Sequence, residues 1–261
     1  MFQYDFMQHA LWAILLAAFL GGLMGYLILL RRLAFAAHGL GHISFTGATF
    51  ALLVNASPML GQFAATGLAA FLMGFLGHTL QKRDTAVAMV LAVMLGLGVL
   101  CLHYYVGSAN TAASLLFGDV LGVSVPQLKI MLLATLLVVG IVILILRPLV
   151  FNSVAGQLAS AKGVQSRGIN MIFLLLVAIA VTLVAQVVGA LLVFVLLVGP
   201  AAISLNWTRS FWSGVLVSIG IAIALGVLSL VVAFYGNLPV SVDLTGLVAV
   251  VYLLSLCVRR V

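Results

Sequence analysis

Two histidines, His38 and His42, are the residues of this chain whose type and spacing best suit chemistry. They lie four positions apart, so on a helix both imidazoles share one face. Neutral imidazole is the commonest protein ligand for transition metals. Ionisable groups at membrane depth tend to mark the path of whatever crosses. The spacing therefore predicts a metal pathway, and the alternative is that the two rings make hydrogen bonds between helices.

Asp119 is a third candidate for this pathway. It belongs to an apolar segment, 112–125, that is too short to cross a bilayer. Such a segment indicates a re-entrant or interfacial helix that is buried against protein. An acidic residue at membrane depth needs a reason, and lying near the metal path is one. Capping a helix N-terminus and lying at the membrane interface are equally open.

The composition of the chain predicts a membrane protein. Of its 261 residues, 66% are hydrophobic and 6% are charged, and the mean hydropathy is +1.39. Soluble domains carry about 25% charged residues. The apolar runs are about 17–25 residues long and do not alternate, which favours helices. We expect an all-α, polytopic transmembrane bundle in which residues 1–261 form a single domain.

The apolar runs predict about eight or nine spans, and the basic residues between them predict the orientation. Nine spans place nearly all Lys and Arg on one side, which is taken as cytoplasmic. In the cell's inner membrane, the N-terminus then lies on the outer side and the C-terminus lies in the cytoplasm. Separately, a Gly-Pro pair at 199–200 should kink or end its helix. The predicted spans are 10–30, 34–54, 58–81, 85–105, 127–147, 170–187, 190–206, 211–235 and 244–258.

Several function classes are disfavoured by the residues that are missing. The sequence has no P-loop, no GxSxG, no HExxH and no paired carboxylates, so it predicts neither an ATPase nor a hydrolase. Only four residues are acidic, whereas ion-coupled carriers usually keep acidic residues in their spans. The net charge of +7 lies in the loops and does not indicate nucleic-acid binding. A chain of this kind fits one subunit of a larger machine.

Five stretches, in matching order and spacing, resemble the permeases of metal-type ABC importers, namely zinc permeases of the ZnuB type and their manganese relatives. The similarity covers nearly the whole chain, and the length matches as well. The stretches are RRLAFAAHGLGHISFTGATFALL (31–53), KRDTAVAMVLAVMLGLG (82–98), SLLFGDVLGVSVPQL (114–128), LASAKGV (158–164) and VVGALLVFVLLVGPAA (187–202).

The resemblance implies the membrane-spanning permease subunit of an ABC importer for a divalent transition metal ion. ATP hydrolysis then occurs in a separate ATPase, so this chain is not an enzyme and binds no cofactor of its own. A binding protein delivers the ion outside, and two permeases pair as a homodimer. A short cytoplasmic helix docks on the ATPase in such importers. The residues that match it are Gln157, Leu158, Ala159, Ser160, Ala161, Lys162, Gly163 and Val164.

The chain departs from the family pattern at His38, where those permeases place an aspartate on the metal path. The family's histidine one turn later aligns with His42. Carboxylate suits manganese and iron, whereas imidazole suits zinc, copper and nickel. We therefore expect zinc as the cargo. Manganese, iron or a metal chelate remains the alternative, followed by a carrier that works without an ATPase.

Overall fold

The computed structural model describes residues 4–76, 80–105, 114–154, 166–236 and 239–257. Within them the chain forms helices and turns and contains no strand, which confirms the all-α prediction. The helices are α1 (Asp5–Leu30), α2 (Ala34–Leu53), α3 (Pro58–Leu76), α4 (Leu80–Tyr104), α6 (Val125–Val154), α8 (Ser166–Val188), α9 (Val193–Trp207), α10 (Phe211–Gly236) and α11 (Val240–Cys257).

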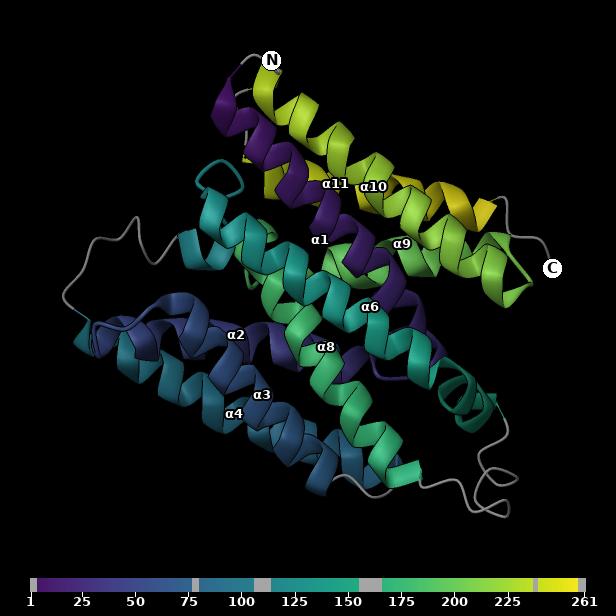
Figure 1. Cartoon of the computed structure of the whole chain (residues 1–261), viewed down its shortest axis with the longest axis horizontal. Coiled ribbons are helices and arrows are strands. Elements are labelled where there is room, and N and C mark those ends of the chain that lie inside the picture. The colour runs from purple at the N-terminus through teal and green to yellow at the C-terminus, as the bar shows by residue number, and fades with distance from the viewer. Residues whose placement is uncertain (1–3, 77–79, 106–113, 155–165, 237–238, 258–261) are drawn as a thin grey trace. The chain divides into compact units, whose positions relative to one another are not determined.

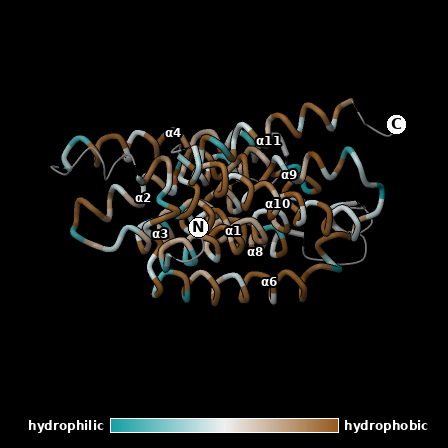
Figure 2. The backbone as a smooth tube through the Cα atoms, turned by 90° about the horizontal axis from the view of Figure 1, so that it is seen from above, coloured by the Kyte–Doolittle hydropathy of each residue, from teal (hydrophilic) through white to brown (hydrophobic). Residues whose placement is uncertain are grey.

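Each predicted span overlaps one of these helices. Seven helices are long and apolar enough to cross a membrane, and apolar residues line most of the helical length in Figure 2. The other two are α2 and α9. Helix α2 carries both histidines and three hydroxyl side chains among its 20 residues, and α9 has only 15 residues. The chain is therefore a polytopic helical membrane protein.

The chain divides into two compact units, which are described separately. Unit 1 comprises Met1–Leu29, Gly107–Leu132 and Leu183–Val261, and unit 2 comprises Leu30–Val106 and Leu133–Thr182. Helices α9, α10 and α11 belong to unit 1, as does α1 up to Leu29. Helices α2, α3 and α4 belong to unit 2, while α6 and α8 contribute residues to both. The expected single domain stays a prediction.

Small residues let the helices of unit 1 approach closely. A Cβ atom on Gly22 would lie 2.7 Å from the Cα atom of Ile219, and one on Gly25 would meet the carbonyl of Leu197. The Ser218 hydroxyl donates to the Gly22 carbonyl at 2.8 Å. Helices α9, α10 and α11 pack against one another in this unit (Figure 1). Unit 1 is thus held by close backbone contact and by a hydroxyl bond across helices.

Helix α2 packs against both α3 and α4 in unit 2 (Figure 1). At the α3 crossing, a Cβ atom on either Gly47 or Gly61 would meet the carbonyl oxygen of the other. At the α4 crossing, a Cβ atom on Gly98 would lie 2.7 Å from the Thr46 hydroxyl. That hydroxyl donates to the Met94 carbonyl at 2.8 Å. Helix α2 is therefore fixed on two sides.

The turn between α2 and α3 follows from its residues. Asn55 has φ 56°, the left-handed conformation that Asn adopts more readily than most residues. The Ala56 N–H donates to the Ala51 carbonyl at 2.7 Å, which satisfies one of the last carbonyls of α2. Pro58 is the first residue of α3, where a proline loses no hydrogen bond.

Helix α6 is longer than the predicted span, which ended at residue 147. Its start is capped, because the Ser124 N–H and hydroxyl both bond to the Gln127 side-chain oxygen, at 2.9 and 3.0 Å. Pro148 lies inside the helix, which continues to Val154. A proline removes one hydrogen bond, but membrane helices tolerate this when other groups compensate. The end of the apolar run was therefore not the end of the helix.

Proline also fails to end α9. The helix continues through Pro200 to Trp207, so the Gly-Pro pair at 199–200 does not end it, and a kink there stays a prediction. It begins at Val193, three positions later than predicted, because a turn precedes it. Helix α1 begins at Asp5 rather than at residue 10, since a helix can extend beyond its apolar run into water.

The predicted short segment forms one helical turn at 114–117 among its described residues, followed by an irregular turn. Gly118 and Gly189 both have positive φ, +80° and +94°, and a Cβ atom on either would meet the backbone around the other. The Ala190 N–H donates to the Leu115 carbonyl at 3.3 Å. The segment is therefore joined to the α8–α9 turn within unit 1. Of its described residues only Val120 and Val123 are buried, so the predicted burial against protein is not seen along most of it.

Candidate functional site

The structure brings His38 and His42 together on α2, in unit 2. Their Nε2 atoms lie 3.2 Å apart. The ring centroids are 4.6 Å apart, and the ring planes are nearly perpendicular at 89°. Both side chains are half-buried. A hydrogen bond between the two nitrogens needs one ring to donate and the other to accept, so the tautomers of the pair are linked.

This separation suits two nitrogens that bind one metal ion. At Zn–N distances of about 2.0–2.1 Å, tetrahedral geometry places two ligand nitrogens about 3.3 Å apart. For both Nε2 atoms to bind one ion, the donor ring must first change to the tautomer that carries its proton on Nδ1. Both rings must then turn so that their lone pairs point at the ion, while the two nitrogens can stay about as far apart as they are. Across the ranges that the structure describes, no three His, Cys, Asp or Glu side chains gather to hold a metal. Two ligands make a weaker site than the four of a structural zinc site.

The contacts of α2 with its neighbours in unit 2 hold the pair in place. A Cβ atom on Gly39, between the two histidines, would lie 3.3 Å from Val87 and 3.7 Å from Met73. Further along α2, the Thr49 hydroxyl lies 3.4 Å from the Gly98 carbonyl of α4. These contacts, together with the Thr46 bond, fix how α2 is turned about its axis. The side of α2 that carries both imidazoles is thereby fixed relative to α3 and α4.

Asp119 is exposed and caps a turn. Its Oδ1 atom accepts a hydrogen bond from the Gly122 N–H at 2.9 Å, shortly before α6 begins. This role is close to the capping interpretation that the sequence left open. Asp119 belongs to unit 1 and the histidines belong to unit 2. Its place on a metal path therefore stays a prediction.

The predicted ATPase-docking segment, 157–164, lies outside the described residues. The helices on both sides of it are described, since α6 is placed up to Val154 and α8 from Ser166. The docking role of the segment therefore stays a prediction, and only its flanking helices can enter a structural argument.

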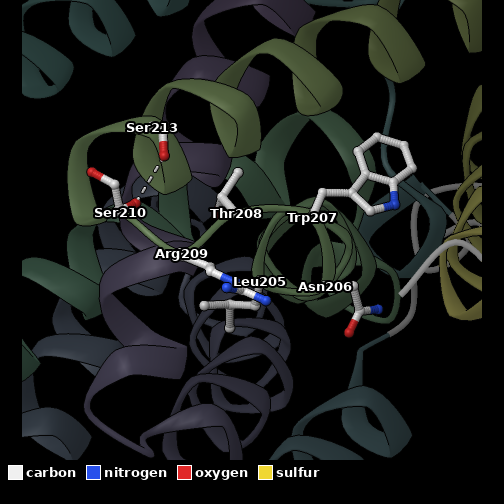
Figure 3. Close-up of a pocket in the computed structure, with 7 residues that line it drawn as sticks. All are labelled: Leu205, Asn206, Trp207, Thr208, Arg209, Ser210 and Ser213. Carbon is white, nitrogen blue, oxygen red and sulfur yellow. Dashed lines mark hydrogen bonds between the residues drawn. The ribbon is translucent and has the colours of Figure 1, made fainter. Parts of the chain in front are cut away.

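A hollow of about 590 Å³ lies at the α9–α10 turn, and its lining does not suit a metal pathway (Figure 3). Two of its hydroxyls already have partners: the Thr208 hydroxyl donates to the Ser204 carbonyl, and the Ser213 hydroxyl donates to the Ser210 carbonyl. None of the lining residues is a histidine, a cysteine or an acid, so the hollow offers poor metal ligands. The lining residues are Leu205, Asn206, Trp207, Thr208, Arg209, Ser210 and Ser213.

Sequence reasoning did not find the residues that support the pair. Gly47 and Ala51 on α2, and Gly61 and Ala65 on α3, have a spacing of four that is typical of closely packed membrane helices. That spacing was the available signal. The hydroxyl of Thr46 had no comparable signal, because its partner is a backbone carbonyl distant in sequence.

Comparison with known proteins gives consistent matches along the chain. The model of the ABC 3 transport family matches residues 3–259. An uncharacterised membrane protein of Synechocystis is 29% identical over 262 residues, which covers 99% of this chain and 92% of that protein. The manganese import system permease protein ScaB of Streptococcus parasanguinis is 25% identical over 257 residues, covering 97% and 90%. PsaBC from Streptococcus pneumoniae in complex with Fab shares the fold, with a TM-score of 0.85 at 22% identity and coverage of 97% and 91%.

Proposed function

The chain belongs to the ABC 3 transport family, and from this premise we propose that it is the permease subunit of an importer for divalent transition metal ions. The observation that carries the proposal is the His38–His42 pair, whose nitrogens are separated by nearly the distance that one bound ion requires. The pair contacts the ion in transit, and its two ligands allow the ion to leave again. The chain supplies the path and does no covalent chemistry.

The partners of the proposed importer follow from the family. A separate ATPase supplies the energy and docks on residues 157–164, and a binding protein delivers the ion outside. Two copies of the chain pair as a homodimer, which would supply two His38–His42 pairs. The permease lies in the inner membrane with its N-terminus outside and its C-terminus in the cytoplasm, because that arrangement places the basic loops inside.

Zinc is the proposed cargo. Two imidazoles favour zinc over manganese, which prefers oxygen ligands. Manganese is the second candidate, and it is supported by the relative ScaB, which is named a manganese import permease. The ligand chemistry and the relative therefore point to different ions.

Metal uptake decides between the two. Cells that express the chain with its ATPase and binding protein are given radioactive zinc, with unlabelled manganese as competitor, and then radioactive manganese with zinc as competitor. We expect saturable zinc uptake that requires an active ATPase and resists manganese. A control strain carries an ATPase that cannot hydrolyse ATP.

Three other results have distinct meanings. Manganese uptake that resists zinc keeps the importer but replaces its cargo. Uptake that persists with the inactive ATPase supports a carrier that acts alone. The absence of ATP-dependent uptake of either ion overturns the proposed function.

A further inference from the structure

Arg31 connects the start of α2 to the first turns of α8 within unit 2. Its guanidinium donates a hydrogen bond to the Asn170 side-chain oxygen. Its Cζ atom also lies 5.0 Å from the centre of the Phe173 ring. Asn170 and Phe173 are three positions apart on α8, so they present one face to Arg31. The sequence marked Arg31 only as a basic residue between two spans.

This pair of contacts needs an arginine. A planar guanidinium can lie over an aromatic ring and donate a hydrogen bond at its edge at the same time. Phe173 is fully buried, with 0% of its surface exposed, so the ring is a fixed platform. A lysine at this position would keep the charge but would lose the flat stacking surface.

The contacts join two parts of the chain that matter for transport. Arg31 lies just before α2, whose first residue is Ala34, and His38 lies about one turn further along the helix. Helix α8 begins at Ser166, shortly after the predicted docking segment, 157–164. Few residues therefore separate Arg31 from the histidine pair, and few separate the start of α8 from the predicted docking segment.

We infer that Arg31 is a positioning residue of the transport cycle, which ties the first turns of α8 to the start of α2. A displacement of the docking segment then moves α8, Arg31 and α2 together, and with α2 the histidine pair. The transport role rests on the proposed function, whereas the mechanical link between α8 and α2 does not. The two are therefore tested by separate measurements.

The first measurement is the amount of metal transported per ATP hydrolysed. The full chain is reconstituted in liposomes with its ATPase and binding protein, and uptake of Zn²⁺ and Mn²⁺ is measured beside ATP hydrolysis. Loss of the link in Arg31→Ala should lower this ratio by about fivefold or more, the range of a typical coupling between sites. Arg31→Lys should recover part of it, because the charge remains.

The matched control is Arg32→Ala, which removes the same charge from the next position. Arg32 is exposed, so the ratio should stay within about twofold of the wild type. Two results overturn the transport role: equal ratios in the two alanine variants, and a parallel loss of uptake and hydrolysis in Arg31→Ala that leaves the ratio unchanged.

The second measurement follows the link without any metal. Spin labels are placed on α2 at Phe35 and on α8 at Ile172, which are both 43% exposed, after Cys101 and Cys257 have been replaced. In the complex with the ATPase, the label distance should stay narrow and unchanged on adding ATP, and should broaden in Arg31→Ala. An unchanged distribution in that variant overturns the link. If the wild type transports neither ion, the proposed function fails, and this distance still decides whether Arg31 joins the two helices.

Discussion

Helices α2 and α10 differ in what their polar side chains do. In α10 the three serines donate to backbone carbonyls, at 3.0 Å for Ser213 and 2.8 Å for Ser218 and Ser229. The helix contains no histidine and no charged residue. Helix α2 also uses hydroxyls to bond backbone carbonyls, but it carries two histidines that are hydrogen-bonded to each other.

Under the proposed function, the difference separates polar residues that serve packing from polar residues that serve transport. A hydroxyl that bonds a carbonyl in a neighbouring helix stabilises their contact, usually by less than about 1 kcal/mol. An ionisable group at membrane depth is expensive, and its presence needs a functional reason. If this separation holds, substitutions in the two classes should affect different measurements.

The largest effect on transport is expected from His38→Ala combined with His42→Ala. Removing both imidazoles should lower metal uptake by at least about tenfold, which corresponds to about 1.4 kcal/mol of lost interaction. Membrane insertion and assembly with the ATPase should remain normal, because the pair has no part in the α2 contacts with α3 and α4 described above. Uptake is measured with radioactive zinc, and assembly is measured by co-purification.

The control for the histidine pair is His103→Ala, at the end of α4. The centroids of the His103 and Tyr104 rings lie 5.4 Å apart there. This variant should transport normally. Normal uptake by the double variant would remove α2 from the metal path and would end the contrast with α10.

The second effect concerns stability. Gly47→Ala should destabilise unit 2 by about 3 kcal/mol, the upper end of the usual cost of overpacking, because its Cβ would meet the Gly61 carbonyl. Gly67→Ala on α3 is the matched control, since a Cβ there meets nothing within 4 Å. The measurement is reversible unfolding of the purified protein in detergent. Equal stability of the two variants would mean that the α2–α3 contact does not hold α2.

Most of the fold could be predicted, because long apolar runs in a membrane leave few alternatives to helices. The helix ends were harder. Hydropathy reports where a chain leaves the apolar layer, whereas α1 and α6 extend beyond it, to Asp5 and Val154. Pro200 was misleading as a possible helix end, since α9 continues past it, just as α6 continues past Pro148.

The site was predicted only where it is local. The pair of His38 and His42 follows from helical spacing, so the sequence was sufficient to place the two rings together. The contacts of Arg31 with Asn170 and Phe173 were not predictable, because they join positions separated by more than a hundred residues. For Asp119, capping was one role that the sequence left open, and in the structure its side chain caps a turn in its own segment.

A smaller effect is expected when His38 is replaced by Asp. The change restores the ligand pair that the family pattern places on the metal path, and carboxylate favours manganese over zinc. The preference for zinc over manganese should fall by roughly fivefold, or about 1 kcal/mol. It is measured as the manganese concentration that halves zinc uptake. His38→Asn is the control, because it has a similar size but no charge. A shift of the same size in both variants would rule out ligand charge as the cause.

The smallest effect should come from α10, in Ser218→Ala. The variant removes the hydroxyl that donates to the Gly22 carbonyl and leaves a methyl group in its place. That carbonyl lies within α1, where it still accepts a helical hydrogen bond, so no buried group loses its last partner. The loss should be about 0.6 kcal/mol, the average for side-chain hydrogen bonds between membrane helices.

The control is Ser213→Ala, whose stability should change less, because the exposed Ser213 bonds within its own turn. Both are measured by the same reversible unfolding, with metal uptake alongside. Unchanged uptake in Ser218→Ala would confirm that this hydroxyl serves packing, whereas lost uptake at nearly normal stability would place α10 in the transport path as well.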